Sequence, residues 1–256
     1  MSRHFALMPP SVSTRDSRKA TQVTLRHAAV AAQVAGDVAL TREWTQALAA
    51  CTDAPIAKAR ALVSLGAVAF SISRLNAEAA GRLTLQALQP LAALHATPGT
   101  GLDAAFGAVT NNLASDLLER PLDDLAQPDL RVALQLAAEH AQRFWARAGT
   151  WVNHGRAHYL RAMAANALGL GADGVAQARA GLVLLDEFDH DGQEKVDRAF
   201  LELELATGLR LAERPERAEA LARALALAAQ FGPAWLDRWF AERCTRNEAL
   251  AAHYGR

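Results

Sequence analysis

A helix–turn–helix pattern that recurs at a spacing of about forty-two residues constrains this chain more than any other feature. Residues 155–182 match residues 197–224 when one segment is shifted onto the other, and Arg156 then falls on Arg198. Several alanines match as well, and small residues at matched positions let neighbouring helices pack closely. A single helical hairpin cannot bury its apolar face, so the repeat predicts a stack of hairpins that share a continuous core.

The amino-acid composition favours helix along nearly the whole chain. Roughly a fifth of the residues are alanine, which loses no side-chain entropy on entering a helix, and only 9 residues are proline. The chain is 51% hydrophobic and 21% charged, which is typical of a folded, water-soluble protein. No segment combines apolar–polar alternation with an excess of β-branched residues. We therefore predict an all-α fold.

Proline, glycine and asparagine residues divide the chain into expected helices, most of them in pairs. The expected pairs are 16–35 with 41–51, 56–74 with 77–95, 102–119 with 130–148, 151–168 with 175–188, and 195–212 with 216–231. A last expected helix, 234–253, has no successor. We expect a flexible tail over residues 1–15, about five helical hairpins over 16–231, and a C-terminal capping helix within 232–256.

Charge and cysteine usage argue against several classes of partner. The chain has 27 basic and 27 acidic residues, so it lacks the basic excess of a nucleic-acid-binding module. Its 2 cysteines fit neither a disulfide framework nor a metal-binding spacing. The start of the chain does not resemble a signal peptide, and the longest apolar stretch, residues 61–72, is too short to span a bilayer. We predict a soluble, cytoplasmic protein with no nucleic-acid or membrane partner.

Three short motifs resemble the Trp-x-x-Leu-Gly-x-x-Tyr core in the first helix of tetratricopeptide repeats. They are Ser64-Leu65-Gly66, Asn111-Asn112-Leu113-Ala114 and Trp151-x-x-His154-Gly155-x-x-His158. Residues 217–225 resemble the second helix of that repeat. Over about residues 16–231 the chain is similar to tetratricopeptide-like proteins, in particular to the longer repeats of MalT-like helical sensor domains. Because the spacing exceeds the usual ~34 residues, other α-solenoids stay open.

This resemblance implies a right-handed superhelix whose first helices line a concave groove, and binding of a protein or peptide partner in that groove. Asn112 and Asn153 hold the same place in successive units, and the resemblance implies that such amides grip the backbone of an extended peptide. The alternative is that they are surface or turn-stabilising amides. We take both asparagines as candidate groove residues.

Two arginines form the second part of the candidate groove. Arg156 and Arg198 lie one unit apart, and guanidiniums in a concavity suit a carboxylate or a phosphate. Glu202 follows Arg198 by one helical turn, so an ion pair within the helix is an equal explanation for that arginine. The lysine and arginine set with which tetratricopeptide repeats hold a C-terminal carboxylate is missing here.

His154 and His158 are the candidate metal ligands, because their spacing places them on one helix face. Glu139 or His140 could supply a third ligand. However, the two histidines replace apolar positions of the repeat, and there is no His-Glu-x-x-His motif to supply a general base. We expect packing histidines with hydrogen-bonded rings, and no metal or cofactor. A metal-dependent enzyme at this pair is the least favoured alternative.

The last expected helix carries an apolar stripe that includes Trp235, Leu236, Trp239 and Phe240. Its expected role is to cover the end of the last hairpin, which would otherwise expose its core. The alternative is a homodimer contact through Trp235, Trp239 and Phe240.

No phosphate-binding glycine loop, nucleophile elbow or kinase signature is present in the sequence. We therefore predict a non-enzymatic adaptor or scaffold that binds a protein or peptide partner. The alternative, from a different functional class, is a sensor or regulatory domain that binds a small ligand between its repeats.

Overall fold

The computed structural model describes residues 14–255 of the chain. All regular secondary structure in this range is helical, and it contains no strand. The prediction of an all-α fold is confirmed. The helices are α1 (Thr14–Val34), α2 (Val38–Thr52), α3 (Ile56–Ser71), η1 (Ile72–Arg74), α4 (Ala77–Leu88), α5 (Leu91–Leu94), α6 (Asp103–Leu118), η2 (Leu122–Ala126), α7 (Pro128–Ala148), α8 (Trp151–Ala167), α9 (Gly171–Phe188), α10 (Lys195–Leu211), α11 (Arg217–Ala228) and α12 (Ala234–Tyr254).

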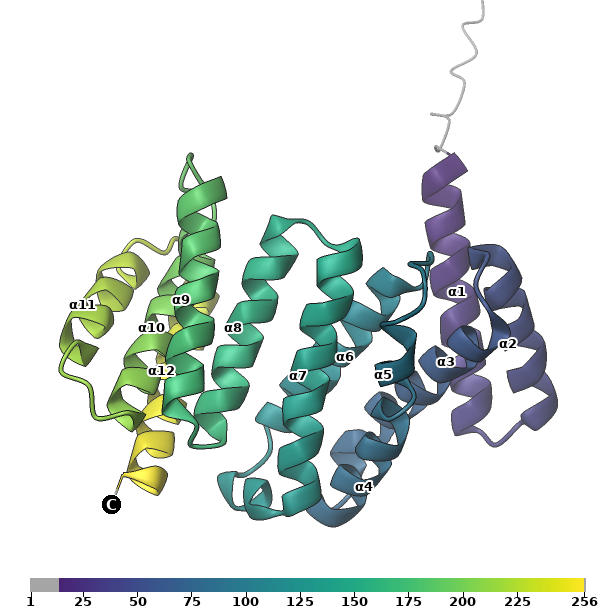
Figure 1. The fold of residues 1–256 in the computed structure, drawn as a ribbon, viewed down its shortest axis with the longest axis horizontal. Coiled ribbons are helices and arrows are strands. Elements are labelled where there is room, and N and C mark those ends of the chain that lie inside the picture. Colours follow the sequence, from purple (N-terminus) through teal and green to yellow (C-terminus); the bar gives the residue numbers. More distant parts are fainter. Residues whose placement is uncertain (1–13, 256) are drawn as a thin grey trace, which may run out of the picture.

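Helices that follow one another in the sequence pack against one another in space (Figure 1). The hairpins pair α1 with α2, α3 with α4, α6 with α7, α8 with α9, and α10 with α11. The first helices also contact one another in order, from α1 through α3, α6 and α8 to α10. The hairpins therefore follow one another along the long axis of the molecule, with α1 and α2 near one end and α11 at the other (Figure 1).

Local sequence signals explain where several helices begin. The Asp37 side chain accepts a hydrogen bond from the backbone of Leu40 at 2.9 Å and caps α2. Asn76 caps α4 through the backbone of Ala79 at 2.8 Å. Pro128 occupies the first position of α7. A backbone N–H at this position would have no partner inside the helix, so proline costs no helical hydrogen bond there. Each side-chain cap stabilises its helix by about 1 kcal/mol.

The largest departure from the expected helices lies at Pro90. The sequence pattern predicts one helix over 77–95, whereas α4 ends at Leu88 and the short helix α5 begins at Leu91. Proline has no backbone N–H to donate, and its ring clashes with the preceding turn of a helix. The apolar periodicity continues through this point, but the backbone hydrogen bonds do not.

The apolar core runs through most of the stack. One cluster joins buried side chains from α1 to α8, among them Leu62 of α3, Phe106 of α6 and Phe144 of α7. Two smaller clusters serve the region around α10. Helices come closest where one of them has glycine: a Cβ added to Gly81 of α4 would lie 2.6 Å from the backbone nitrogen of Leu130 in α7. The core therefore depends on small residues at these crossings.

One helix in the described range, Ile56–Arg74, is long and apolar enough to cross a membrane, with a mean hydropathy of 1.4. The helix reaches this length only by including residues on both sides of the apolar stretch 61–72, which by itself is too short to span a bilayer. In the fold this helix packs against α1, α2, α4 and α6. Its side chains Leu62, Val63 and Leu65 are fully buried. Contacts on several sides explain its apolar composition.

The last helix, α12, packs against α10 and also reaches two earlier hairpins. Its buried face includes Leu236 and Phe240, which belong to the same cluster as Phe200 of α10. Farther along α12, a guanidinium nitrogen of Arg246 donates to the carbonyls of Leu118 and Arg120 at the end of α6. Near its end, the hydroxyl of Tyr254 donates to the carbonyl of Ala167 in α8 at 2.9 Å. The helix therefore ties three hairpins together, which is more than covering the end of the last one.

Candidate functional site

The two predicted groove asparagines have different environments. Asn112 is exposed on α6 and has no hydrogen-bond partner among residues 14–255. Asn153 belongs to a capping box at the start of α8: its Oδ1 accepts from the Thr150 backbone at 2.9 Å and from the Thr150 hydroxyl at 3.1 Å. The turn-stabilising alternative therefore describes Asn153.

Arg156 pairs with acidic side chains at the start of α10. Its Nε donates to Asp197 at 2.7 Å, and a second nitrogen donates to Glu194 at 3.3 Å. The hydrogen bond to Asp197 raises the pKa of this guanidinium. Arg156 thus bridges α8 and α10 and is largely neutralised by the chain's own carboxylates.

Arg198 also has an internal partner, though not the one that the spacing suggested. It donates to Asp186 of α9 at 2.8 Å. Glu202 instead holds Arg223 of α11 through two hydrogen bonds of 2.8 and 2.9 Å. The alternative of an Arg198–Glu202 pair is therefore wrong, because tertiary contacts give each side chain a better partner on a neighbouring helix.

The candidate metal ligands point to different partners. The His154 Nε2 atom lies 3.0 Å from the carbonyl oxygen of Trp145, and the His158 Nδ1 atom lies 3.0 Å from the Gln177 side-chain oxygen. Burial lowers the pKa of His158. The Glu139 carboxylate, one suggested third ligand, pairs with Arg143. Within residues 14–255 no three His, Cys, Asp or Glu side chains come together in a way that could hold a metal ion.

The other suggested third ligand, His140, pairs with a histidine that the sequence pattern does not connect to it. The Nδ1 atom of His140 lies 2.7 Å from Nε2 of His95, and the His95 ring packs on Phe144 at 4.6 Å between centroids. Burial lowers the pKa of His140 to about 4. Both rings are therefore neutral at pH 7, and one nitrogen of the pair donates while the other accepts. The two residues are 45 positions apart, so no local signal could have revealed the contact.

A buried polar network fixes α12 to α8 and α10. Its centre is Glu204, whose carboxylate accepts from Arg243 at 2.7 Å, from Asn247 at 2.9 Å and from Asn166 at 2.8 Å. All four side chains are buried. Removing a carboxylate from water costs free energy, and hydrogen bonds from buried donors offset that cost. We read the network as a structural element, because Arg243, Asn247 and Asn166 all donate to the same carboxylate.

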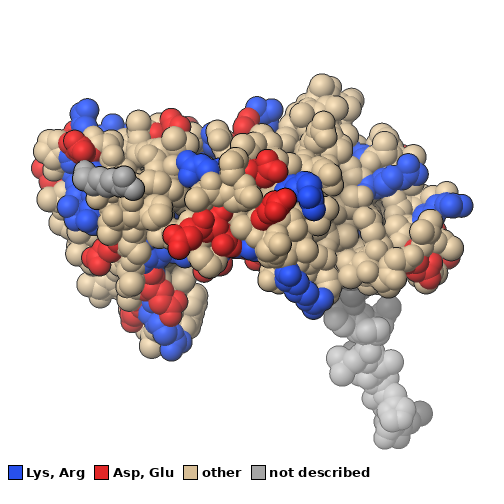
Figure 2. All heavy atoms as spheres, turned by 90° about the horizontal axis from the view of Figure 1, so that it is seen from below, with Lys and Arg blue, Asp and Glu red and all other residues tan. Residues whose placement is uncertain are grey.

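The aromatic residues predicted as a dimer contact divide into two kinds. Phe240 is only 5% exposed and packs on Phe200 at 5.2 Å between ring centroids, so it belongs to the core. Trp235 is 58% exposed and Trp239 is 46% exposed, although Trp239 also packs on Phe200 at 4.4 Å. The two tryptophans remain available at the surface. Elsewhere, Figure 2 shows basic and acidic side chains interspersed over one face of the molecule.

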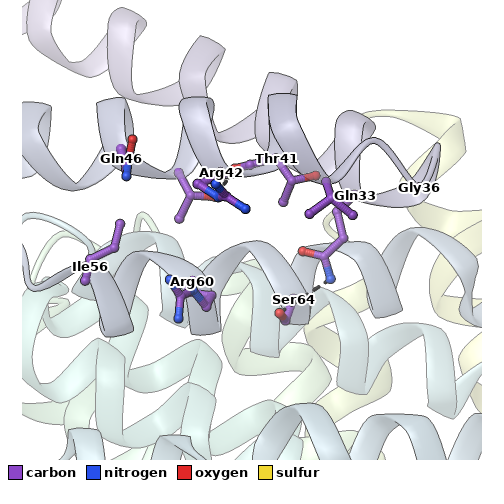
Figure 3. Close-up of a pocket in the computed structure, with 10 residues that line it drawn as sticks. Gln33, Gly36, Thr41, Arg42, Gln46, Ile56, Arg60 and Ser64 are labelled. Atoms are coloured by element: carbon purple, nitrogen blue, oxygen red, sulfur yellow. Dashed lines mark hydrogen bonds between the residues drawn. The ribbon is translucent and has the colours of Figure 1, made fainter.

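A cleft lies between α1, α2 and α3 (Figure 3). We call it the N-terminal cleft. Its volume is about 380 Å³. It is lined by Gln33, Gly36, Val38, Thr41, Arg42, Thr45, Gln46, Ile56, Arg60 and Ser64.

Two arginines face the N-terminal cleft from different helices. Arg42 belongs to α2 and Arg60 to α3, and Figure 3 shows them on opposite sides of the opening. Neither guanidinium has an ion-pair or hydrogen-bond partner in the described part of the chain. Across the same cleft the Gln33 amide donates to the Ser64 hydroxyl at 3.4 Å. No sequence motif marks this site, because its arginines are scattered among ordinary helix-surface residues.

Together these contacts define an all-α protein of consecutively packed helical hairpins with an N-terminal cleft whose two arginines have no partner within residues 14–255. Comparison of the chain with protein-family models, with curated proteins and with solved structures gave no match.

Proposed function

We propose that this chain is a non-enzymatic adaptor that binds a segment of a protein partner. In this proposal its hairpins form a tetratricopeptide-like superhelical array, and the protein acts in the cytoplasm. The order in which the hairpins pack supports the array, since each first helix contacts the next along the chain. The short motifs quoted above support the likeness to long, MalT-like repeats.

The observation that carries this proposal is the contrast between paired and unpaired polar groups. Arg156 and Arg198 are held by carboxylates of the chain, whereas Arg42 and Arg60 face a cleft and have no partner among the residues that the structure describes. The helices that carry these two arginines are already folded and packed, so binding requires little ordering of the backbone. We therefore place the main binding site in the N-terminal cleft. The exposed amide of Asn112 stays in the proposal as a second contact.

A small-ligand sensor is the second candidate function, and the size of the cleft favours it. At about 380 Å³, the N-terminal cleft falls within the range of cavities that hold small molecules. Thermal-shift screening of the purified protein against metabolites tests this alternative. A metabolite that raises the unfolding midpoint of the wild type but not of the Arg42→Ala/Arg60→Ala variant would replace the adaptor proposal by the sensor.

Affinity enrichment followed by direct binding tests the adaptor. Partners retained by the wild-type protein are identified, and each is purified and titrated against the wild type and Arg42→Ala/Arg60→Ala. We expect a partner that binds the wild type and loses affinity for the double variant. The matched control is Arg238→Ala, an exposed arginine of α12 outside the cleft. Partners that bind the double variant as tightly as the wild type would move the site away from the cleft, and no direct binder at all would end the adaptor proposal.

A further inference from the structure

We propose that the N-terminal cleft recognises a phosphate monoester, carried by a phosphorylated side chain of the partner segment. This inference rests on the proposed function, because it names the chemistry that the adaptor would bind. The two guanidiniums of Arg42 and Arg60 bring two positive charges to one cleft. A phosphate monoester carries a charge of about −1.5 to −2 at neutral pH, so it balances both.

The electrostatics of the cleft favour an anion. None of its lining residues is acidic. The carboxylate of Asp37, at the start of α2, is already used to cap that helix through the Leu40 backbone. The residues that line the cleft therefore carry two positive charges and no negative one, which favours anions there. Arg156 and Arg198 lack this property, because each has its own carboxylate.

The arrangement of donors suits the oxygens of a phosphate. Arginine presents a planar fork that donates two parallel hydrogen bonds to such a group, and here one fork comes from α2 and another from α3 (Figure 3). Gln33, Gln46 and Ser64 line the same cleft and add neutral donors. A single carboxylate would leave one of the two guanidiniums unbalanced. The phosphate is therefore the better match in charge and in number of acceptors.

The rim of the cleft indicates that the phosphate belongs to a peptide. Val38 is 70% exposed and Ile56 is 40% exposed, and both line the cleft beside the arginines. An apolar residue next to a phosphorylated side chain could cover them, and it would add the favourable burial of apolar surface. Free phosphate offers nothing to these side chains.

Fluorescence anisotropy with a degenerate library of phosphoserine peptides tests the inference, with the unphosphorylated library and inorganic phosphate as competitors. We expect the phosphorylated library to bind at least about tenfold more tightly than the unphosphorylated one. Arg42→Gln and Arg60→Gln should each weaken binding by about tenfold, while Arg238→Gln leaves it unchanged. Circular dichroism confirms that each variant is folded.

Three results would overturn the inference. The first is equal binding of the phosphorylated and unphosphorylated libraries, and the second is unchanged affinity in both cleft variants. The third is inorganic phosphate that binds as tightly as the peptides, because this would identify a site for the free ion.

Phosphatase treatment of a partner found by enrichment separates this inference from the adaptor proposal. A partner that still binds after phosphatase treatment supports the adaptor proposal and contradicts recognition of a phosphate. If no partner is found, the adaptor proposal fails, and the peptide titration still reports on the phosphate.

Discussion

Arg243 of α12 donates its Nε hydrogen to the Glu204 carboxylate of α10 over 2.7 Å, and both side chains are buried. The pair joins the last helix of the chain to a helix that lies 39 positions earlier. Because neither charge can reach water, each is stable only while the other stays in place. The contact makes α12 an integral part of the stack.

The Glu204 network predicts a large loss of stability when its centre is removed. Glu204→Ala leaves the Arg243 guanidinium buried without a counter-charge, and we expect the free energy of unfolding to fall by about 3–5 kcal/mol. Urea denaturation followed by circular dichroism measures the change. Asp186→Ala is the matched control, since it removes an exposed carboxylate from its ion pair with Arg198 and should cost less than about 1 kcal/mol. Equal losses in the two variants would show that the buried pair does not hold α12.

Protonation of the His95–His140 pair should make stability depend on pH. Burial lowers the pKa of His140 to about 4 in the folded protein, below the unperturbed value of about 6.5. Below about pH 6.5 the unfolded chain binds a proton that the folded chain refuses, so the free energy of unfolding falls as the pH drops from about 6.5 to 4. After allowance for partial solvent screening, we expect a loss of about 1–2 kcal/mol over this range.

The His140→Phe variant isolates this effect from the protonation of carboxylates. Its unfolding free energy, measured between pH 7.5 and pH 4.5, should fall less steeply than that of the wild type. His190→Gln changes an exposed histidine in the loop after α9 and should follow the wild-type profile. A His140→Phe profile parallel to the wild type would mean that His140 takes up its proton at the same pH in the folded and in the unfolded chain.

The effects of alanine substitutions on the free energy of unfolding should distinguish the roles of Asn153 and Asn112. Asn153→Ala removes the capping box of α8, and we expect it to cost about 1 kcal/mol. Asn112→Ala changes an exposed side chain without a described partner, so its effect should stay within about 0.5 kcal/mol. Thermal or chemical unfolding of both variants makes the comparison. An Asn153→Ala protein of wild-type stability would return that residue to the list of binding candidates.

The aromatic residues of α12 should divide in the same way. Phe240→Ala empties a core position packed on Phe200, and we expect a loss of about 3–5 kcal/mol. Trp235→Ala alters a side chain that is mostly in solvent, and its effect on stability should be less than about 1 kcal/mol. Urea denaturation tests both. Light scattering of wild type and Trp235→Ala then decides whether the tryptophan contributes to a dimer, because only a contact residue would shift the molecular mass.

The helical fold and most helix positions could be predicted from the sequence. The expected start of helix 56–74 is the observed start of α3, and the expected helices 151–168 and 195–212 end within one residue of α8 and α10. These features depend on apolar periodicity, alanine content and capping residues, all of which act within a few positions along the chain. The break at Pro90 is also a local effect of the sequence. The apolar pattern continues across this proline, so periodicity alone does not reveal the break.

The pairing of side chains was decided only by the tertiary structure. The sequence pattern placed Arg156 and Arg198 in an open groove, but contacts with neighbouring helices gave each of them a carboxylate. In the same way, Arg42 and Arg60 face one cleft only because α2 and α3 pack beside each other. Helix formation is a local property of the chain, whereas the partner of a side chain depends on how the hairpins stack. A difference of one turn or a few degrees in that stacking is enough to change which groups are neutralised and which stay free for a ligand.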